Sequence, residues 1–251
     1  MAEHDSRRPS EWRRLFSIAV DLIDQLRENA GGHDFEWSFG GGTAMMIQIG
    51  HRESHDIDVF LDDPQLLGFI DPSRSRLRFE PMPSDYQGYG LRFQKFAFEG
   101  IGETDFIVAG VLTKTPFKTY DVEGRAVRLE TIPEIIAKKV YYRGSQARPR
   151  DIFDIAAAAR SQLGEVVDAL RVSAQVARTR ERSEKLNPEF VSRATAQSMI
   201  MADYEASAAN SLDAAIAVLD RRCHRPSRPG RLPSGSLPGR GGAFSTTPTP
   251  W

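Results

Sequence analysis

The sequence contains little that would place it in a membrane or in a disulfide-bonded scaffold. It has one cysteine, Cys223, among 251 residues, which excludes an intramolecular disulfide and any multi-cysteine metal site. No apolar run approaches the roughly 20 residues that a membrane-spanning helix needs, and residues 1–10 are charged. We therefore expect a soluble cytoplasmic protein that makes no membrane contact, and we expect it to be a monomer.

Net charge is also nearly absent, because 33 Lys and Arg residues stand against 34 Asp and Glu residues. The balance is uneven along the chain, since the residues after 220 include six arginines and no acid, which leaves −7 for residues 1–220. The same stretch has six prolines and five glycines. A segment of this composition cannot bury enough apolar surface to offset its chain entropy, so we expect residues 223–251 to form a disordered tail.

The remaining pattern predicts an α+β fold in two parts. Residues 1–130 mix helical and strand patterns, which indicates a mixed β-sheet flanked by helices, and residues 131–222 carry only helical patterns. Thr131 and Glu134 have the spacing of a capping box at the start of the second part. The expected helices cover residues 11–30, 43–49, 131–143, about 149 onward, 165–185, 188–201 and 204–222. The expected strands cover residues 35–39, 56–60, 91–98 and 104–111, followed by a hairpin at Gly124.

A glycine-rich turn, Gly40-Gly41-Gly42-Thr43, stands between an expected strand and an expected helix. Glycines let a phosphate group approach the backbone, and the free N–H groups and dipole of a helix N-terminus favour negative charge. Thr43 is the expected cap of that helix. Taken alone, such a turn is more often a tight loop than a phosphate site.

Two acidic residues follow the turn on a short expected strand. Asp56 and Asp58 are two residues apart, so their carboxylates project from the same face. Convergent carboxylates suit Mg²⁺, with Mn²⁺ as an alternative, and two such ions would position a triphosphate for in-line attack on its α-phosphorus. Turn and acid pair together, in this order, are much more specific than either alone.

Such a site usually needs a third carboxylate from a neighbouring strand. Asp105 lies on the expected strand over 104–111 and is the preferred candidate, and Glu103, on the same face, is the alternative. The forked guanidinium of Arg52 and the hydroxyl of Ser54 are expected to contact the phosphates.

The run Phe39-Gly40-Gly41-Gly42-Thr43-Ala44, with the acid pair after it, resembles the nucleotidyltransferase toxins of the AbiEii/AbiGii type, within the polymerase-β-like superfamily. A second stretch is similar to that family's Lys…Arg…Asp-x-x-Asp signature. It contains Lys139, Arg143, Asp151 and Asp154. The two signatures are specific as a pair and together span roughly residues 35–160.

The resemblance implies a nucleotidyltransferase domain over residues 1–130, a helical domain over 131–222, and roles for individual residues. Gly41, Gly42 and Thr43 would hold the nucleoside triphosphate (NTP), Asp56, Asp58 and Asp105 would bind the metal, and Asp105 would also activate the acceptor hydroxyl. Lys139 is implied as the functional lysine, with Lys138 as its competitor for that role, and Asp151 and Asp154 as the acidic pair near the NTP.

The residues of the helical signature also have a physical interpretation of their own. Lys139 and Arg143 lie four apart on one helix face and form a cationic patch toward phosphate or base. For Asp151, capping a helix or supporting the lysine explains the residue as well as substrate contact does. Tyr141 and Tyr142 are expected to pack in the core rather than to stack on a nucleobase.

The expected function is Mg²⁺-dependent transfer of a nucleoside monophosphate from an NTP to a hydroxyl, with release of pyrophosphate. The resemblance implies the toxin of a toxin–antitoxin or phage-defence pair, a tRNA acceptor, and a separate antitoxin protein as partner. RNA contact would need a local patch in an acidic body, such as Lys138, Lys139, Arg143, Arg148 and Arg150, with or without the arginine tail. The alternatives are transfer to a small molecule and a non-catalytic NTP-binding module.

Overall fold

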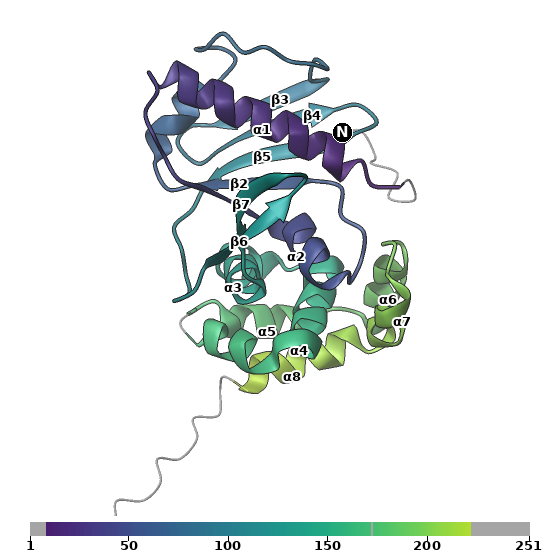
Figure 1. Cartoon of the computed structure of the whole chain (residues 1–251). Helices are drawn as coiled ribbons and strands as arrows, with labels where there is room; N and C mark the ends of the chain where they lie inside the picture. Colours follow the sequence, from purple (N-terminus) through teal and green to yellow (C-terminus); the bar gives the residue numbers. More distant parts are fainter. Residues whose placement is uncertain (1–8, 172, 222–251) are drawn as a thin grey trace, which may run out of the picture.

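The structure is a computed structural model and describes residues 9–171 and 173–221 (Figure 1). The predicted tail over residues 223–251 lies outside the described residues. Within the described part of the chain, no helix is both long enough and apolar enough to cross a membrane.

A seven-stranded mixed sheet forms the first part of the molecule, in the order β3-β4-β5-β2-β1-β7-β6. Strand β1 runs antiparallel to β2 and parallel to β7, and β2 runs parallel to β5. This arrangement confirms the predicted α+β fold with a mixed sheet flanked by helices. The strands are β1 (Trp37–Gly40), β2 (Ile57–Leu61), β3 (Asp85–Tyr89), β4 (Phe93–Phe98), β5 (Gly102–Val108), β6 (Phe117–Val122) and β7 (Arg125–Glu130).

Helix α1 (Trp12–Asn29) covers one face of this sheet (Figure 1). The ring of Phe16 on α1 stacks on Phe39 of β1, with 5.4 Å between ring centroids. Phe39 lies opposite Val59 in the β1–β2 register, so Val59 faces α1 as well. Because side chains alternate along a strand, Asp58 and Phe60 point to the opposite face of the sheet.

The helices of the second part gather on the side of the sheet away from α1 (Figure 1). Helix α3 packs on α4, and α4 packs on α8. The helices after α1 are α2 (Gly41–Ile49), α3 (Ile132–Arg143), α4 (Pro149–Leu170), α5 (Val176–Glu184), α6 (Pro188–Ala196), α7 (Ala202–Ala209) and α8 (Ser211–Arg221), with 3₁₀ turns η1 (Pro64–Phe69) and η2 (Gly144–Gln146). Strand β7 ends at Glu130 and α3 begins at Ile132, and the division into separate domains there stays a prediction.

Several details of the helical part differ from the sequence-based expectation. The helix predicted over 165–185 is wrong, because α4 ends at Leu170 and α5 begins at Val176. Between them, the hydroxyl of Ser173 accepts a hydrogen bond from the backbone N–H of Gln175, a local bond that competes with continued helix. The predicted capping box at Thr131 is also absent, since the Thr131 hydroxyl donates to the backbone carbonyl of Thr115.

The helix predicted over 188–201 ends early, at Ala196, and α7 begins at Ala202. The helix predicted over 204–222 is divided at Asn210 between α7 and α8. The residues between α6 and α7 run beside the segment that follows α2. Arg52 and Ile200 form an isolated β-bridge, and the backbone N–H groups of Glu53 and Met201 donate to the carbonyls of Met199 and His51. The connection between α6 and α7 therefore holds the chain just before β2.

Candidate active site

The glycine-rich turn joins β1 to α2, as the sequence predicts, but the helix begins at Gly41, two residues before the predicted cap. Gly41 has a φ of +69°, in the left-handed region that favours glycine. A Cβ atom at Gly41 would overlap Oδ2 of Asp58. Glycine is therefore required here both by the backbone and by the carboxylate that lies against the turn.

Thr43 has a different partner from the predicted one. Its side chain is fully buried, and its hydroxyl donates a 2.5 Å hydrogen bond to the backbone carbonyl of Asp56. This bond fastens the first turn of α2 to the residue before β2. What the turn offers to an anion is consequently its backbone N–H groups, which a helix N-terminus leaves unpaired.

Asp58 and Asp105 lie opposite each other in the parallel register of β2 and β5. On the other side of Asp105, β4 places Lys95 in register with it, and Lys95 Nζ lies 3.3 Å from Asp105 Oδ2. Lys95 also pairs with Glu103 at 2.6 Å. Asp58, Asp105 and Lys95 thus form one polar row across three neighbouring strands.

The two carboxylates of this row share a poorly solvated space. Burial, followed by the charge of Asp58, raises the pKa of Asp105 to about 7, and burial likewise raises the pKa of Asp58. Oδ1 of Asp105 is buried and has no hydrogen-bond partner. Two facing carboxylates with an unsatisfied oxygen fit a divalent cation that prefers oxygen ligands, because such an ion would compensate both charges.

Asp56, the remaining predicted metal ligand, is placed less favourably than Asp58 and Asp105. Asp56 precedes β2 and does not line the pocket that Asp58 and Asp105 share, and its Oδ1 accepts a 3.4 Å hydrogen bond from the backbone N–H of Glu103. In the part of the chain that the structure describes, no group of three or more His, Cys, Asp or Glu side chains is arranged to hold a metal ion. Glu103, the alternative candidate for the acid on β5, does not line the pocket either. The residues present therefore fit a metal site built on Asp58 and Asp105.

A pocket of about 630 Å³ lies between the sheet and α3 and contains this polar row. A second row of pocket residues lies beside the polar row, two residues further along β2 and β5 and two residues earlier on the antiparallel β4. This second row is apolar and consists of Phe60, Ile107 and Phe93. The pocket therefore has a charged part beside the glycine turn and an apolar part beyond it. Helix α3 contributes Ile135, Lys138, Lys139, Tyr142 and Arg143 to the opposite wall.

The two neighbouring lysines of α3 are held by different carboxylates. Lys138 is buried, pairs with Glu130 at 2.5 Å, and lies 3.8 Å from the centroid of the Phe60 ring. Lys139 pairs with Asp151 at 3.2 Å and with Asp154 at 3.0 Å. Both lysines line the pocket, so position alone does not separate the two candidates for the functional lysine.

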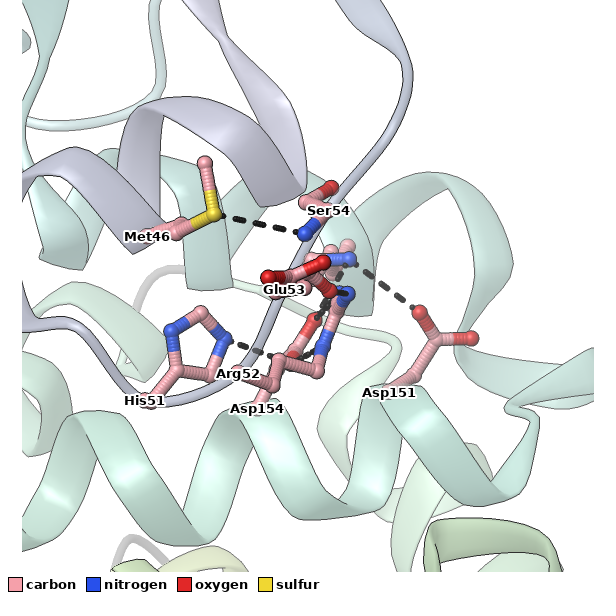
Figure 2. A network of polar contacts seen from close by, with 8 residues as sticks. Met46, His51, Arg52, Glu53, Ser54, Asp151 and Asp154 are labelled. Atoms are coloured by element: carbon pink, nitrogen blue, oxygen red, sulfur yellow. Dashed lines mark hydrogen bonds and ion pairs between the residues drawn. The ribbon is translucent and has the colours of Figure 1, made fainter. Parts of the chain in front are cut away.

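Asp154 is the centre of a buried network that joins the two parts of the chain (Figure 2). Its Oδ1 lies 2.8 Å from Nε of Arg52 and 3.0 Å from Nε2 of His51, and its Oδ2 lies 3.0 Å from Nη2 of Arg52. Burial alone would raise the pKa of Asp154, but the charges of Arg52 and Lys139 outweigh it and hold that pKa well below its usual range. Asp154 is thus an ionised anchor for three neighbouring side chains.

This network changes the interpretation of several predicted NTP ligands. Arg52 gives its forked guanidinium to Asp154 and to the backbone carbonyl of Glu53, and a Cβ at Gly42 would lie 2.9 Å from its Nη2. Its contact with phosphate stays a prediction. Ser54 is buried beside Gly42, where a Cβ would lie 2.7 Å from its Oγ. Asp151 accepts a hydrogen bond from the backbone N–H of Arg148 and holds Lys139, which is the capping and supporting role that the sequence left open.

Residues 25–221 match a family model described as nucleotidyl transferase AbiEii toxin of a type IV toxin–antitoxin system. The chain belongs to this family. Its membership makes the chain a nucleotidyltransferase of the AbiEii toxin family, which agrees with the resemblance carried by the glycine turn, the acid pair and the helical signature. None of the curated proteins compared with the chain is significantly similar to it.

Three solved structures resemble the AbiEii chain distantly. A Helicobacter pylori protein assigned as a nucleotidyltransferase is 16% identical, with a TM-score of 0.44, and 82% of this chain and 94% of that one are covered. The antibiotic-resistance factor ANT(2'')-Ia is 18% identical, with a TM-score of 0.40 over 61% and 90% of the two chains. JHP933 from H. pylori is 15% identical, with a TM-score of 0.42 over 83% and 91%. Likenesses of this size carry no functional inference.

Several pocket residues of this AbiEii chain are absent from the predicted site residues, among them Lys95, Glu130 and Tyr142. Lys95 is one of the residues on β4 whose side chains point to the pocket face of the sheet. That it meets Asp105 follows only from the pairing register of β4 and β5. Glu130, at the end of β7, is buried on the pocket wall. Tyr142 is 54% exposed at the pocket, and Tyr141 is 48% exposed, so the prediction that they pack in the core is wrong.

Proposed function

We propose that this nucleotidyltransferase moves a nucleoside monophosphate from an NTP to a hydroxyl of RNA, in the first instance tRNA, with Mg²⁺ or Mn²⁺ and release of pyrophosphate. The observation that carries the proposal is the composition of one pocket. The turn at Gly41, the facing carboxylates Asp58 and Asp105, and Lys139 all border the same volume of about 630 Å³.

Each of these groups has a task in the proposed reaction. Backbone N–H groups at Gly41 and Gly42 bind the negatively charged phosphates, and Lys139, held by Asp151 and Asp154, adds a fixed positive charge. Asp58 and Asp105 would hold the metal, which supplies charge neutralisation for the triphosphate. The acceptor oxygen attacks the α-phosphorus, the bond from that phosphorus to the pyrophosphate oxygen breaks, and Asp105 takes the hydroxyl proton.

The order of the strands supports an arrangement with the two substrates on opposite sides of the site. The glycine turn follows β1, and Asp105 on β5 is two strands away, so the NTP lies toward β1 and the acceptor hydroxyl approaches from β5 and β4. On the acceptor side the pocket is lined by Arg92 and Phe93, and Tyr142 and Arg143 are exposed on the facing helix. Arginine beside aromatic rings suits the phosphates and bases of a single-stranded RNA end.

The predicted cationic patch needs revision for the same reason. Lys138 and Lys139 are engaged by carboxylates, whereas Arg143, Arg148 and Arg150 are exposed. We therefore propose that these arginines, with Arg92, supply the local positive charge for RNA on an otherwise acidic body. The partner implied by the toxin family is a separate antitoxin, and we propose that the pair acts in phage defence in the cytoplasm.

A labelling assay tests the proposed activity. Each α-labelled NTP is incubated with the protein, Mg²⁺ and total tRNA, beside the variants Asp58→Ala and Asp105→Asn. We expect label in RNA with the wild type and a loss of at least about 100-fold with either variant, the scale of removing a catalytic acid or base. Glu103→Gln is the matched control, because Glu103 pairs with the same Lys95 but lies outside the pocket.

The same assay separates the alternatives. Label that enters a small-molecule acceptor and not RNA would replace the proposed acceptor while leaving nucleotidyl transfer intact. NTP binding without labelling of any acceptor would favour a non-catalytic module and contradict the proposed reaction. Omission of the divalent ion, or its removal with a chelator, should abolish labelling and leave the circular dichroism spectrum unchanged.

A further inference from the structure

Glu130 is a buried carboxylate on the pocket wall to which the proposed reaction gives no task. It is 1% exposed and closes β7. Its Oε1 accepts hydrogen bonds from Ser38 Oγ at 3.0 Å and from Lys138 Nζ at 2.5 Å, but its Oε2 is buried without any hydrogen-bond partner. An unsatisfied oxygen of a buried carboxylate costs free energy, so its presence in a substrate pocket calls for a ligand.

The position of Glu130 relative to the acids is set by the sheet. Strand β1 lies between β7 and β2, and it pairs Gly40 with Asp58 and Phe39 with Leu129. Glu130, Gly40 and Asp58 therefore follow one another across three strands, which puts about 10 Å between the backbones at Glu130 and Asp58. Because Gly40 has no side chain, Oε2 of Glu130 lies over it, where a Cβ would overlap both this oxygen and the ring of Phe60.

We propose that Glu130 hydrogen-bonds a ribose hydroxyl of the bound NTP and thereby selects ribonucleotides over deoxyribonucleotides. This inference rests on the proposed function. The ribose is the group joined directly to the α-phosphate, which the reaction places at Asp58, and it therefore lies between the polar row and the apolar row. The base then reaches Phe60, which lines the apolar part of the pocket.

The carboxyl group of Glu130 suits a hydroxyl as its hydrogen-bond partner. Burial raises the pKa of Glu130 to about 7 despite the neighbouring charge of Lys138. A hydroxyl can donate to the ionised carboxylate and accept from the protonated one. A carboxylate that binds ribose hydroxyls is also a common arrangement in nucleotide-binding folds.

A binding experiment tests the assignment independently of catalysis. Calorimetric titrations in Mg²⁺ compare a non-hydrolysable NTP analogue with its 2′-deoxy and 3′-deoxy forms. A hydrogen bond to a charged, buried group predicts on the order of 10- to 100-fold tighter binding of the ribonucleotide than of one deoxy form. Glu130→Met should remove this difference, and the analogues of all four bases show whether base preference changes as well.

Two further variants control for misfolding. Glu130→Met combined with Lys138→Met replaces the whole buried pair by apolar side chains, an exchange that proteins usually tolerate, and it should also bind ribo and deoxy forms equally. Ser38→Ala removes a hydrogen bond to the other oxygen, Oε1, so it should keep the preference for the ribonucleotide.

The outcomes separate this inference from the proposed function. Equal binding of ribo and deoxy analogues by the wild type would refute the assignment, and so would a preference that survives in both methionine variants. Variants that change the ranking of the four bases but keep the sugar preference would show that Glu130 contacts the base instead. If the wild type binds no NTP analogue at all, the proposed function itself fails and this inference falls with it.

Discussion

Replacing Asp154 by asparagine should destabilise the protein strongly although the side-chain shape is kept. The change leaves the guanidinium of Arg52, itself 5% exposed, without the carboxylate that two of its nitrogens contact. Breaking a buried ion pair in this way costs about 3–5 kcal/mol. For a folded region of about 200 residues this corresponds to a melting temperature roughly 6–20 °C lower.

The effect of Asp154→Asn should depend on pH in a defined way. The pKa of Asp154 is well below 3.8 in the folded protein, so the carboxylate stabilises the fold at every pH above its unfolded pKa of about 3.9. That contribution is lost as the pH falls through the lower, folded value. The difference between wild type and variant should therefore stay constant between about pH 5 and pH 8 and shrink below pH 4.

Urea denaturation followed by circular dichroism at each pH measures both quantities. Asp168→Asn is the matched control, because Asp168 lies on the same helix in an exposed pair with Arg171 and should change the free energy of unfolding by less than about 0.5 kcal/mol. A loss of under about 1 kcal/mol for Asp154→Asn, or a difference that persists unchanged at pH 3, would refute the view that Asp154 is an ionised buried anchor.

Other substitutions test the turn and the pocket wall. Gly41→Ala should abolish nucleotidyl transfer, because the added Cβ displaces the Asp58 carboxylate. Gly100→Ala is the control, because Gly100 has a similar φ of +70° and no atom lies within 4 Å of the added Cβ. It should cost only backbone strain and leave the labelling rate unchanged. Thr43→Val should lower the free energy of unfolding by about 1–3 kcal/mol in urea titrations, and Thr43→Ser should restore it, because the buried bond to the Asp56 carbonyl needs a hydroxyl. Tyr142→Ala should raise the KM for RNA with little change in melting temperature, and Tyr142→Phe should keep the wild-type KM if base stacking is the role of this exposed ring.

The sequence predicts those parts of the site that depend on local spacing. Alternation along a strand puts Asp58 on one face, and the same rule on β5 leaves Asp105 and Glu103 as candidates. The register of β2 and β5 then pairs Asp58 with Asp105. The run of three glycines likewise marks the turn at Gly41. These features need only a few neighbouring residues, which is why they can be predicted without knowledge of the tertiary structure.

Features that depend on distant pairing could not be predicted in this way. Arg52 looks like a phosphate ligand in sequence, but its carboxylate partner lies 102 residues later, on α4. Lys95 joins the site only because β4 pairs with β5 in one particular register. Glu130 marks the end of a strand in sequence, and its unsatisfied oxygen becomes visible only when Ser38, Lys138 and Gly40 surround it.

The segment from His51 to Glu53 has a consequence for how the protein folds. It belongs in sequence to the sheet-bearing half, yet its side chains are held by Asp154 of α4 and its backbone by the connection between α6 and α7. A fragment ending at Glu130 would lack these contacts, so the segment would be exposed and Arg52 would have no counter-charge. We therefore expect one cooperative unfolding transition for the whole described region, with neither half able to reach its native state during synthesis before α4 and α6 have emerged.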